Sequence, residues 1–264
     1  MKPIWNGMIS FGLVSIPIGL EPATQKTGPE LHMLDKADHE RIKTKKVNEN
    51  TGKEVTEANI VKGFMYNGDY VILEDEDFEE AAPEKTKLIE IENFIDLKEV
   101  DPIYFDTPYY AHPEKRGVKA YTLLRSVLSK SNKAGVGKFV LRTKEYVCLL
   151  RAMENVIVVQ TLLFPEEVRT TEELNLDEEK ISKDELELAI DYIAENTEKF
   201  DVSKYHNTYY KALFDRINEK AKGKAPKRGK VIEMKPAAKK NDDLVSQLIN
   251  SLNTKKKSRS KEVN

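Results

Sequence analysis

The residues best suited to binding chemistry are basic side chains crowded between residues 41 and 46. Arg41, Lys43, Lys45 and Lys46 all lie in this short segment. Alternate side chains of an extended chain share a face, so Arg41, Lys43 and Lys45 would form one cationic row. Such a row suits a phosphate backbone. It also fits a solvated edge strand that lysines protect from aggregation, and the residues alone leave both interpretations open.

The acidic counterpart is the segment from Glu74 to Glu80, which places six carboxylates within seven residues. Paired carboxylates could hold Mg²⁺ in a nuclease. Such sites, however, draw their acids from separated segments and add a base or a lysine. A contiguous acidic run is more typical of a solvated helix start, where Asp and Glu meet the positive end of the helix dipole. We therefore expect a helix here rather than a metal site.

The nucleophiles and metal ligands of the chain have no catalytic arrangement. The single cysteine, Cys148, lies in the apolar run from Tyr146 to Leu150 and is predicted to be a buried, inert thiol. The four histidines are scattered without ligand spacing. No Walker loop, zinc-protease motif or nucleophile elbow occurs. The sequence thus predicts a binding protein that is not an enzyme, with no metal and no cofactor.

Length and composition favour a soluble protein with a heavily charged surface. The 264 residues can form one large domain or two small ones, and 33% of them are charged. No run approaches the roughly 18 apolar residues that read as a membrane span, and no leader pattern opens the chain. We expect a cytoplasmic protein that does not contact a membrane.

The formal net charge of −2 conceals a strong asymmetry. Residues 223–264 carry +8, so the first 222 residues carry −10. A basic tail suits a non-specific contact with nucleic acid. The acidic body is compatible with DNA binding only if its basic residues are concentrated on one surface.

The apolar and turn residues predict mostly strands in the first half of the chain. The segment from Met8 to Ile18 has the composition of a buried or half-buried core strand, and Pro17 should end its ladder or lie at a sheet edge. Asn67-Gly68 is a two-residue hairpin signal, and residues 87–97 alternate as a strand. Residues 101–117, rich in Pro and Tyr, are predicted to form a long irregular connection.

The second half is predicted to alternate helices and strands. Residues 117–130 have two apolar rows at helical spacing, and two or three strands follow, with a hairpin near Thr143-Lys144. Ser182 and Glu185 form a capping box for one helix. Asp201 or Ser203 would cap a further helix, which ends at Gly223.

The tail is predicted to be a flexible basic linker followed by a short amphipathic helix. Its Lys, Pro and Gly content indicates that residues 223–241 lack a core. The stripe of a partner-binding helix is formed by Leu244, Val245, Leu248, Ile249 and Leu252. The terminal cations expected to contact DNA are Lys255, Lys256 and Lys257.

Six segments in order carry a resemblance to a known family. They read IWNGMISFGLVSIPIGLEPAT, IVKGFMYNGDYVIL, VDPIYFDTPYY, AYTLLRSVL, TLLFPEEVR and FDVSKYHNTYYKAL. Together they resemble the bacterial Ku family over about the first four-fifths of the chain. The resemblance implies a mixed α/β fold, mainly an antiparallel β-barrel core with inserted arms, followed by C-terminal helices. It also implies a homodimer that forms a ring, with a core over residues 1–222, a linker over 223–241 and a helix with tail over 242–264.

The resemblance further implies sequence-independent binding of double-stranded DNA ends at the nucleoid, in non-homologous end joining. Residues 242–253 would recruit an ATP-dependent DNA ligase of the ligase D type. Local charge patterning, rather than a family site list, selects candidates for the inner wall of the ring: Arg41, Lys43, Lys45, Lys46, Lys53, Lys62, Lys115, Arg116 and Lys119.

One departure from the family concerns the turn at residues 48–55. Several bacterial relatives have Cys-x-x-Cys there, and Asn48 and Thr51 stand at the matching positions. These side chains provide no thiolate, so no structural metal is expected.

Two other functions remain open on the residues alone: an adaptor whose partner is a protein, and a metal-dependent nuclease. Loss of DNA in the presence of Mg²⁺ would favour the nuclease.

Overall fold

The computed structural model describes residues 3–81, 87–174, 176 and 179–223. The chain divides into two compact units, one ending at Thr171 and one beginning at Glu172. Each unit is described by itself below. The predicted division into 1–222, 223–241 and 242–264 stays a prediction, since residues 224–264 lie outside the described part of the chain.

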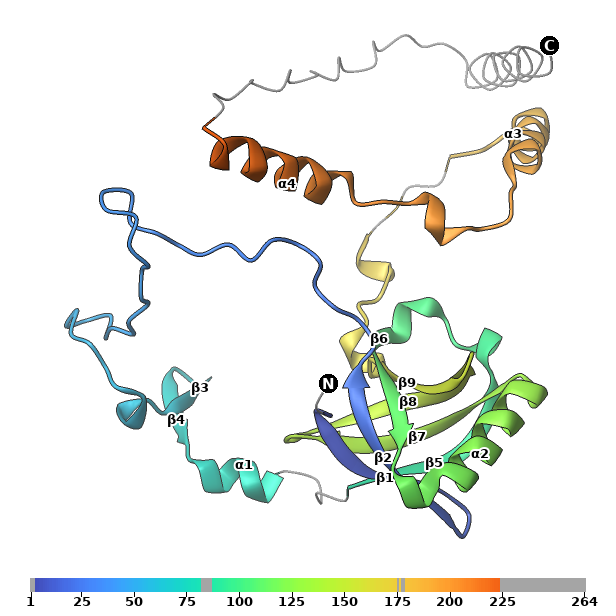
Figure 1. Cartoon of the computed structure of the whole chain (residues 1–264), viewed down its shortest axis with the longest axis horizontal. Helices are drawn as coiled ribbons and strands as arrows, with labels where there is room; N and C mark the ends of the chain where they lie inside the picture. The colour runs from blue at the N-terminus through green and yellow to red at the C-terminus, as the bar shows by residue number, and fades with distance from the viewer. Residues whose placement is uncertain (1–2, 82–86, 175, 177–178, 224–264) are drawn as a thin grey trace. The chain divides into compact units, whose positions relative to one another are not determined.

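The first unit is built on a closed β-barrel whose strands follow the order β1-β2-β6-β9-β8-β7-β5 (Figure 1). Neighbouring strands are antiparallel except where β1 meets β5 in parallel and closes the barrel. The predicted mixed fold with a mainly antiparallel barrel is confirmed. The strands are β1 (Trp5–Phe11), β2 (Val14–Pro22), β5 (Leu88–Asp96), β6 (Phe105–Pro113), β7 (Lys133–Leu141), β8 (Lys144–Met153) and β9 (Val156–Leu162).

The N-terminal segment forms a hairpin, so the prediction of one strand over residues 8–18 is wrong. Gly12, at φ +55°, lies in the tight turn between β1 and β2. Pro17 neither ends the ladder nor lies in an edge strand: it is buried inside β2, opposite Met8, and β2 lies between β1 and β6. The Met8 N–H donates to the carbonyl of Lys87, the residue before β5, and therefore points away from β2. The ladder between β1 and β2 thus needs no N–H from Pro17. Gly117 lies beside the proline ring, where a side chain would collide with it.

Residues 105–113 form β6 between β2 and β9, so the predicted irregular connection is wrong there. Prolines in strands usually occupy bulges and ends. Pro108 follows a register shift that begins at Phe105, and Pro113 is the last residue of the strand. Tyr109 packs against the core cluster.

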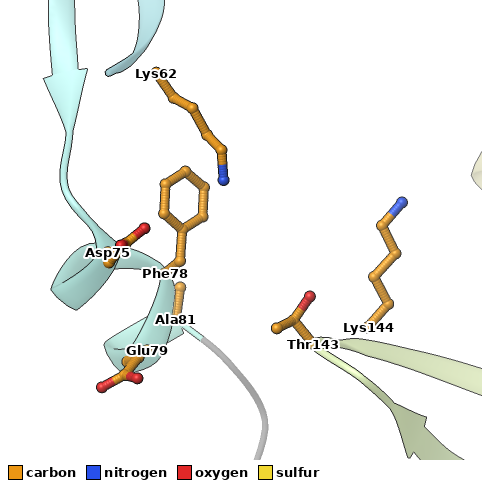
Figure 2. A pocket seen from close by; sticks show the side chains of 7 residues that line it. All are labelled: Lys62, Asp75, Phe78, Glu79, Ala81, Thr143 and Lys144. Carbon is orange, nitrogen blue, oxygen red and sulfur yellow. The ribbon is translucent and has the colours of Figure 1, made fainter. Parts of the chain in front are cut away.

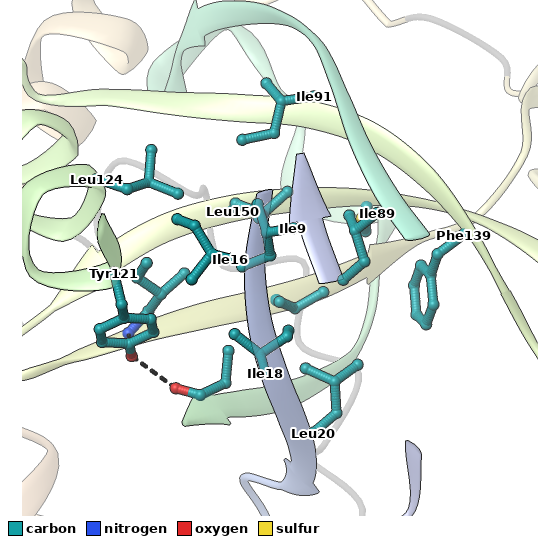
Figure 3. Packing of buried hydrophobic residues seen from close by; sticks show 14 of the residues in the cluster. Ile9, Ile16, Ile18, Leu20, Ile89, Ile91, Tyr121, Leu124, Phe139 and Leu150 are labelled. Atoms are coloured by element: carbon teal, nitrogen blue, oxygen red, sulfur yellow. Dashed lines mark hydrogen bonds between the residues drawn. The ribbon is translucent and has the colours of Figure 1, made fainter. Parts of the chain in front are cut away.

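Helix α2 (Val118–Ser131) covers part of the barrel, and only one of its two apolar rows is buried. Tyr121, Leu124 and Leu128 enter the core, whereas Leu123 and Val127 are more than half exposed. The Tyr121 hydroxyl donates to the Ala111 carbonyl at 2.6 Å, the bond drawn in Figure 3. It also accepts from the Ile157 N–H at 2.7 Å and so joins α2 to two strands.

The predicted strands after α2 are confirmed as the meander β7-β8-β9. Arg142, at φ +64°, begins the turn before Lys144, close to the expected hairpin position.

Two core residues of the barrel have polar groups. Cys148 is fully buried, and burial raises the pKa of its thiol to about 12. Trp5 packs edge-on against Phe139 and donates its indole N–H to the Val140 carbonyl at 3.0 Å.

A long arm, residues 23–81, is inserted between β2 and β5. It contains β3 (Lys62–Tyr66), β4 (Asp69–Leu73) and α1 (Asp75–Ala81), which confirms both the predicted hairpin and the acidic helix. Asn67 and Gly68 both have positive φ, as a two-residue hairpin turn requires. No side chain described in this arm is buried.

The second unit contains α3 (Lys183–Asn196) and α4 (Thr208–Ala221). The capping box of Ser182 and Glu185 is confirmed, and its hydrogen bonds lower the pKa of Glu185. The prediction that Asp201 or Ser203 caps the helix that follows α3 is wrong. Asp201 caps only a 3-10 turn, and the Asn207 side chain caps α4 by accepting from the Tyr210 N–H. None of the helices in the described residues combines the length and apolar composition needed to cross a bilayer.

Candidate nucleic-acid interface

The predicted cationic residues Arg41, Lys43, Lys45 and Lys46 lie in a long loop of the arm. Two isolated bridges hold this loop, one between Leu34 and Arg41 and one between Val47 and Glu54. Between them the chain has no regular strand, but every side chain from 41 to 54 is exposed to solvent. The backbone of this segment is therefore held by a β-bridge at each end, at Arg41 and at Val47.

Two of the cations have acidic partners in the arm. Lys45 Nζ lies 2.6 Å from a Glu54 carboxylate oxygen, and Lys46 Nζ lies 2.9 Å from one of Glu57. All four side chains are more than half exposed, and exposed pairs contribute only about 0–1 kcal/mol. A phosphate group can therefore replace either carboxylate at little cost.

Arg41 and Lys43 have no ion pair with any residue that the structure describes. Between residues 41 and 54 five cations accompany two acids, Glu49 and Glu54. The acidic body of the protein thus carries a local concentration of positive charge on this loop. An exposed surface of this kind can bind phosphates through charge without contacting bases.

The turn at the tip of this loop is closed by side-chain hydrogen bonds. Asn48 Oδ1 accepts from the N–H groups of Asn50 and Thr51, each at 3.0 Å, and from the Thr51 hydroxyl at 3.2 Å. Gly52 provides the positive φ of the turn, and Lys53 follows it with an exposed side chain. Among the described residues no cluster of three His, Cys, Asp or Glu side chains could hold a metal ion.

The remaining predicted cations lie on other elements. Lys62 begins β3, and its ammonium lies 4.2 Å from the centre of the Phe78 ring in α1. Lys115, Arg116 and Lys119 are exposed around the start of α2 on the barrel. The structure therefore gathers five of the nine candidates into the loop and leaves the other four on separate elements.

The comparisons with known proteins give the family. The family model described as the Ku70/Ku80 beta-barrel domain matches residues 10–188. The chain is 40% identical over 255 residues to the non-homologous end joining protein Ku of Bacillus subtilis, covering 92% of this chain and 82% of that protein. The chain belongs to the Ku family.

Ku proteins of other bacteria are similar to this chain to the same degree. The Ku protein of Coxiella burnetii is 40% identical over 227 residues, covering 84% of this chain and 83% of the relative. The Ku protein of Heliobacterium modesticaldum is 39% identical over 249 residues and covers 90% of both chains. The resemblance found in the sequence is confirmed, and so is the Ku barrel.

The predicted tail sites lie outside the described residues. They are the stripe Leu244, Val245, Leu248, Ile249 and Leu252 and the cations Lys255, Lys256 and Lys257. Among the exposed cations of the barrel, the sequence did not single out Lys144, which begins β8 next to the Arg142 turn. The predicted hairpin at that position was the signal available, but its lysine had no neighbouring cationic run.

Proposed function

We propose that this chain binds double-stranded DNA ends as a ring-shaped homodimer in non-homologous end joining, without regard to sequence and without catalysis. The observation that carries the proposal is the 40% identity, over 92% of the chain, to a relative named for that process. Two features of the described residues support it: the positive charge of the loop in the arm, and the exposed apolar side chains of the β3–β4 hairpin.

The charge feature is the loop of the arm. Arg41 and Lys43 lack ion-pair partners among the described residues, and the acids that pair with Lys45 and Lys46 are exposed and exchangeable. Contacts to phosphate fix a protein on DNA but contain no sequence information. A ring lined by such side chains would bind any duplex end, while the acidic surface stays outside.

The apolar feature is the hairpin of β3 and β4. Phe64, Met65 and Tyr70 are each at least half exposed, and they belong to both faces of this two-stranded sheet. An isolated two-stranded hairpin is marginally stable in water. A second copy of the chain that covers these faces would stabilise the hairpin, which supports a homodimer.

The partner in this proposal is an ATP-dependent DNA ligase of the ligase D type. Residues 242–253 have the amphipathic pattern of a docking helix, and the basic tail after them would add a contact to DNA. Removing residues 242–264 should then abolish stimulation of the ligase while the body still binds linear duplex.

The deciding experiment compares one duplex in linear and covalently closed circular forms at the same salt concentration. A ring that loads from ends binds the linear form strongly and the circle weakly. Equal binding to both would refute threading, and would leave a protein that binds the side of the duplex through charge. Absence of binding to either form would favour the adaptor.

A further inference from the structure

A pocket of about 470 Å³ lies between the arm and one end of the barrel (Figure 2). Lys62 and Phe78 line it from the arm, and Thr143 and Lys144 line it from the turn between β7 and β8. Its volume lies in the range of about 300–1,000 Å³ that small-molecule sites occupy. A duplex cannot enter a space of this size, but one nucleotide can.

The side chains around this pocket divide into two groups. Figure 2 shows the carboxylates of Asp75 and Glu79 on the side of the Phe78 ring that is turned away from Thr143 and Lys144. Within the described residues neither Lys62 nor Lys144 has an ion pair. The open part of the pocket therefore combines two ammonium groups, a hydroxyl and an aromatic side chain.

This combination suits a phosphorylated nucleotide. Ammonium groups bind phosphate through charge-assisted hydrogen bonds, and a threonine hydroxyl can donate a further one. An aromatic side chain offers a surface against which any base can pack. Because Lys62 lies over the ring, a phosphate bound to it is held next to that surface.

We propose that this pocket binds a phosphorylated nucleotide from a single-stranded overhang of a DNA end. Lys62 and Lys144 bind the phosphate, and the base packs against Phe78. The inference rests on the proposed function, because end binding brings the overhang to the protein. It adds Lys144, Thr143 and Phe78 to the interface and predicts a preference among ends that phosphate contacts along the duplex alone do not provide.

The first test compares full-length protein on three duplexes of one sequence at one salt concentration: blunt, with a short 5′ overhang bearing a phosphate, and with the same overhang bearing a hydroxyl. We expect the phosphorylated overhang to bind about tenfold more tightly than the blunt end, the size of one stacked base and one charged contact. Lys144→Gln and Phe78→Leu should remove most of that preference and leave blunt-end binding intact. Lys144→Arg, which keeps the charge, should retain it.

Lys130→Gln is the matched control, because Lys130 is an exposed lysine of α2 that does not line the pocket. If the wild-type protein binds all three duplexes equally, the proposal is wrong although end binding stands. If Lys144→Gln weakens blunt and overhanging ends alike, Lys144 is an ordinary phosphate contact and the pocket proposal also fails.

A second measurement does not depend on end binding. A 5′-phosphorylated single-stranded trinucleotide should shift the backbone amide resonance of Thr143, and the same trinucleotide without phosphate should shift it much less. Absence of a shift, or an equal shift with inorganic phosphate alone, would refute a nucleotide site. This readout separates failure of the pocket from failure of the proposed ring.

Discussion

The hydroxyl of Tyr121 is the polar link between α2 and the barrel wall, and Tyr121→Phe removes that link alone. Ala111 and Ile157 face each other in the register of β6 and β9. The hydroxyl donates to the Ala111 carbonyl and accepts from the Ile157 N–H. Both of these residues are fully buried, so no water is positioned to replace the missing oxygen.

The expected loss of stability follows from these two contacts. A buried polar group left without a partner costs about 1–3 kcal/mol. Two groups are affected, but small strand movements recover part of the cost, so we expect a loss of about 2–4 kcal/mol. With a urea m-value of about 2 kcal/mol/M, which is typical of small proteins, the unfolding midpoint should fall by about 1–2 M.

Trp5 provides the assay. It is the single tryptophan of the chain and packs in the barrel core, so its emission during urea unfolding reports on the barrel. Tyr104→Phe is the control, since the Tyr104 hydroxyl has no hydrogen bond to the described residues. If Tyr121→Phe shifts the midpoint no more than Tyr104→Phe does, the reasoning about the buried link is refuted.

The same residue predicts a pH dependence. Burial raises the pKa of Tyr121 above its ordinary value of 10, although the Ile157 hydrogen bond and Arg125 act in the opposite direction. The folded protein therefore holds this proton more tightly than the unfolded chain. The associated stability is complete below pH 10 and is lost as the pH rises further. Tyr121→Phe should make the decline above pH 10 shallower, measured by urea titration at each pH.

Three further predictions concern other parts of the molecule. Burial raises the pKa of Cys148 to about 12, so a thiol-alkylating reagent at pH 8 should modify the protein in urea but not in buffer. Lys43→Gln should weaken binding to linear duplex about threefold to tenfold and reduce the salt slope by about one, while Lys130→Gln should change neither. Ser182→Ala removes the cap of α3 and should cost that helix about 1 kcal/mol, seen as lost ellipticity. Because hydrogen bonds to Ser182 lower the pKa of Glu185, the capping contribution should disappear as the pH falls below 4.5.

Local patterns predicted the elements that depend on a few neighbouring residues. The Asn67-Gly68 hairpin, the acidic start of α1 and the capping box of α3 all appear where the sequence places them. Each depends on backbone conformation or hydrogen bonding within three or four residues. The prediction of the α4 cap failed because Asp201, Ser203 and Asn207 all suit that role. Their order along the chain does not indicate which one precedes the continuous helix.

The residues alone indicated the family, the barrel class and the arm segment that contains Arg41 and Lys43. The tertiary structure then set which elements meet. It made β6 out of a segment rich in Pro and Tyr, because β2 and β9 satisfy its backbone on both sides. It buried one row of α2 and left the other exposed, since a barrel covers only one side of a helix. It also brought Lys144 to the same pocket as Lys62, a pairing of distant residues that no local pattern contains.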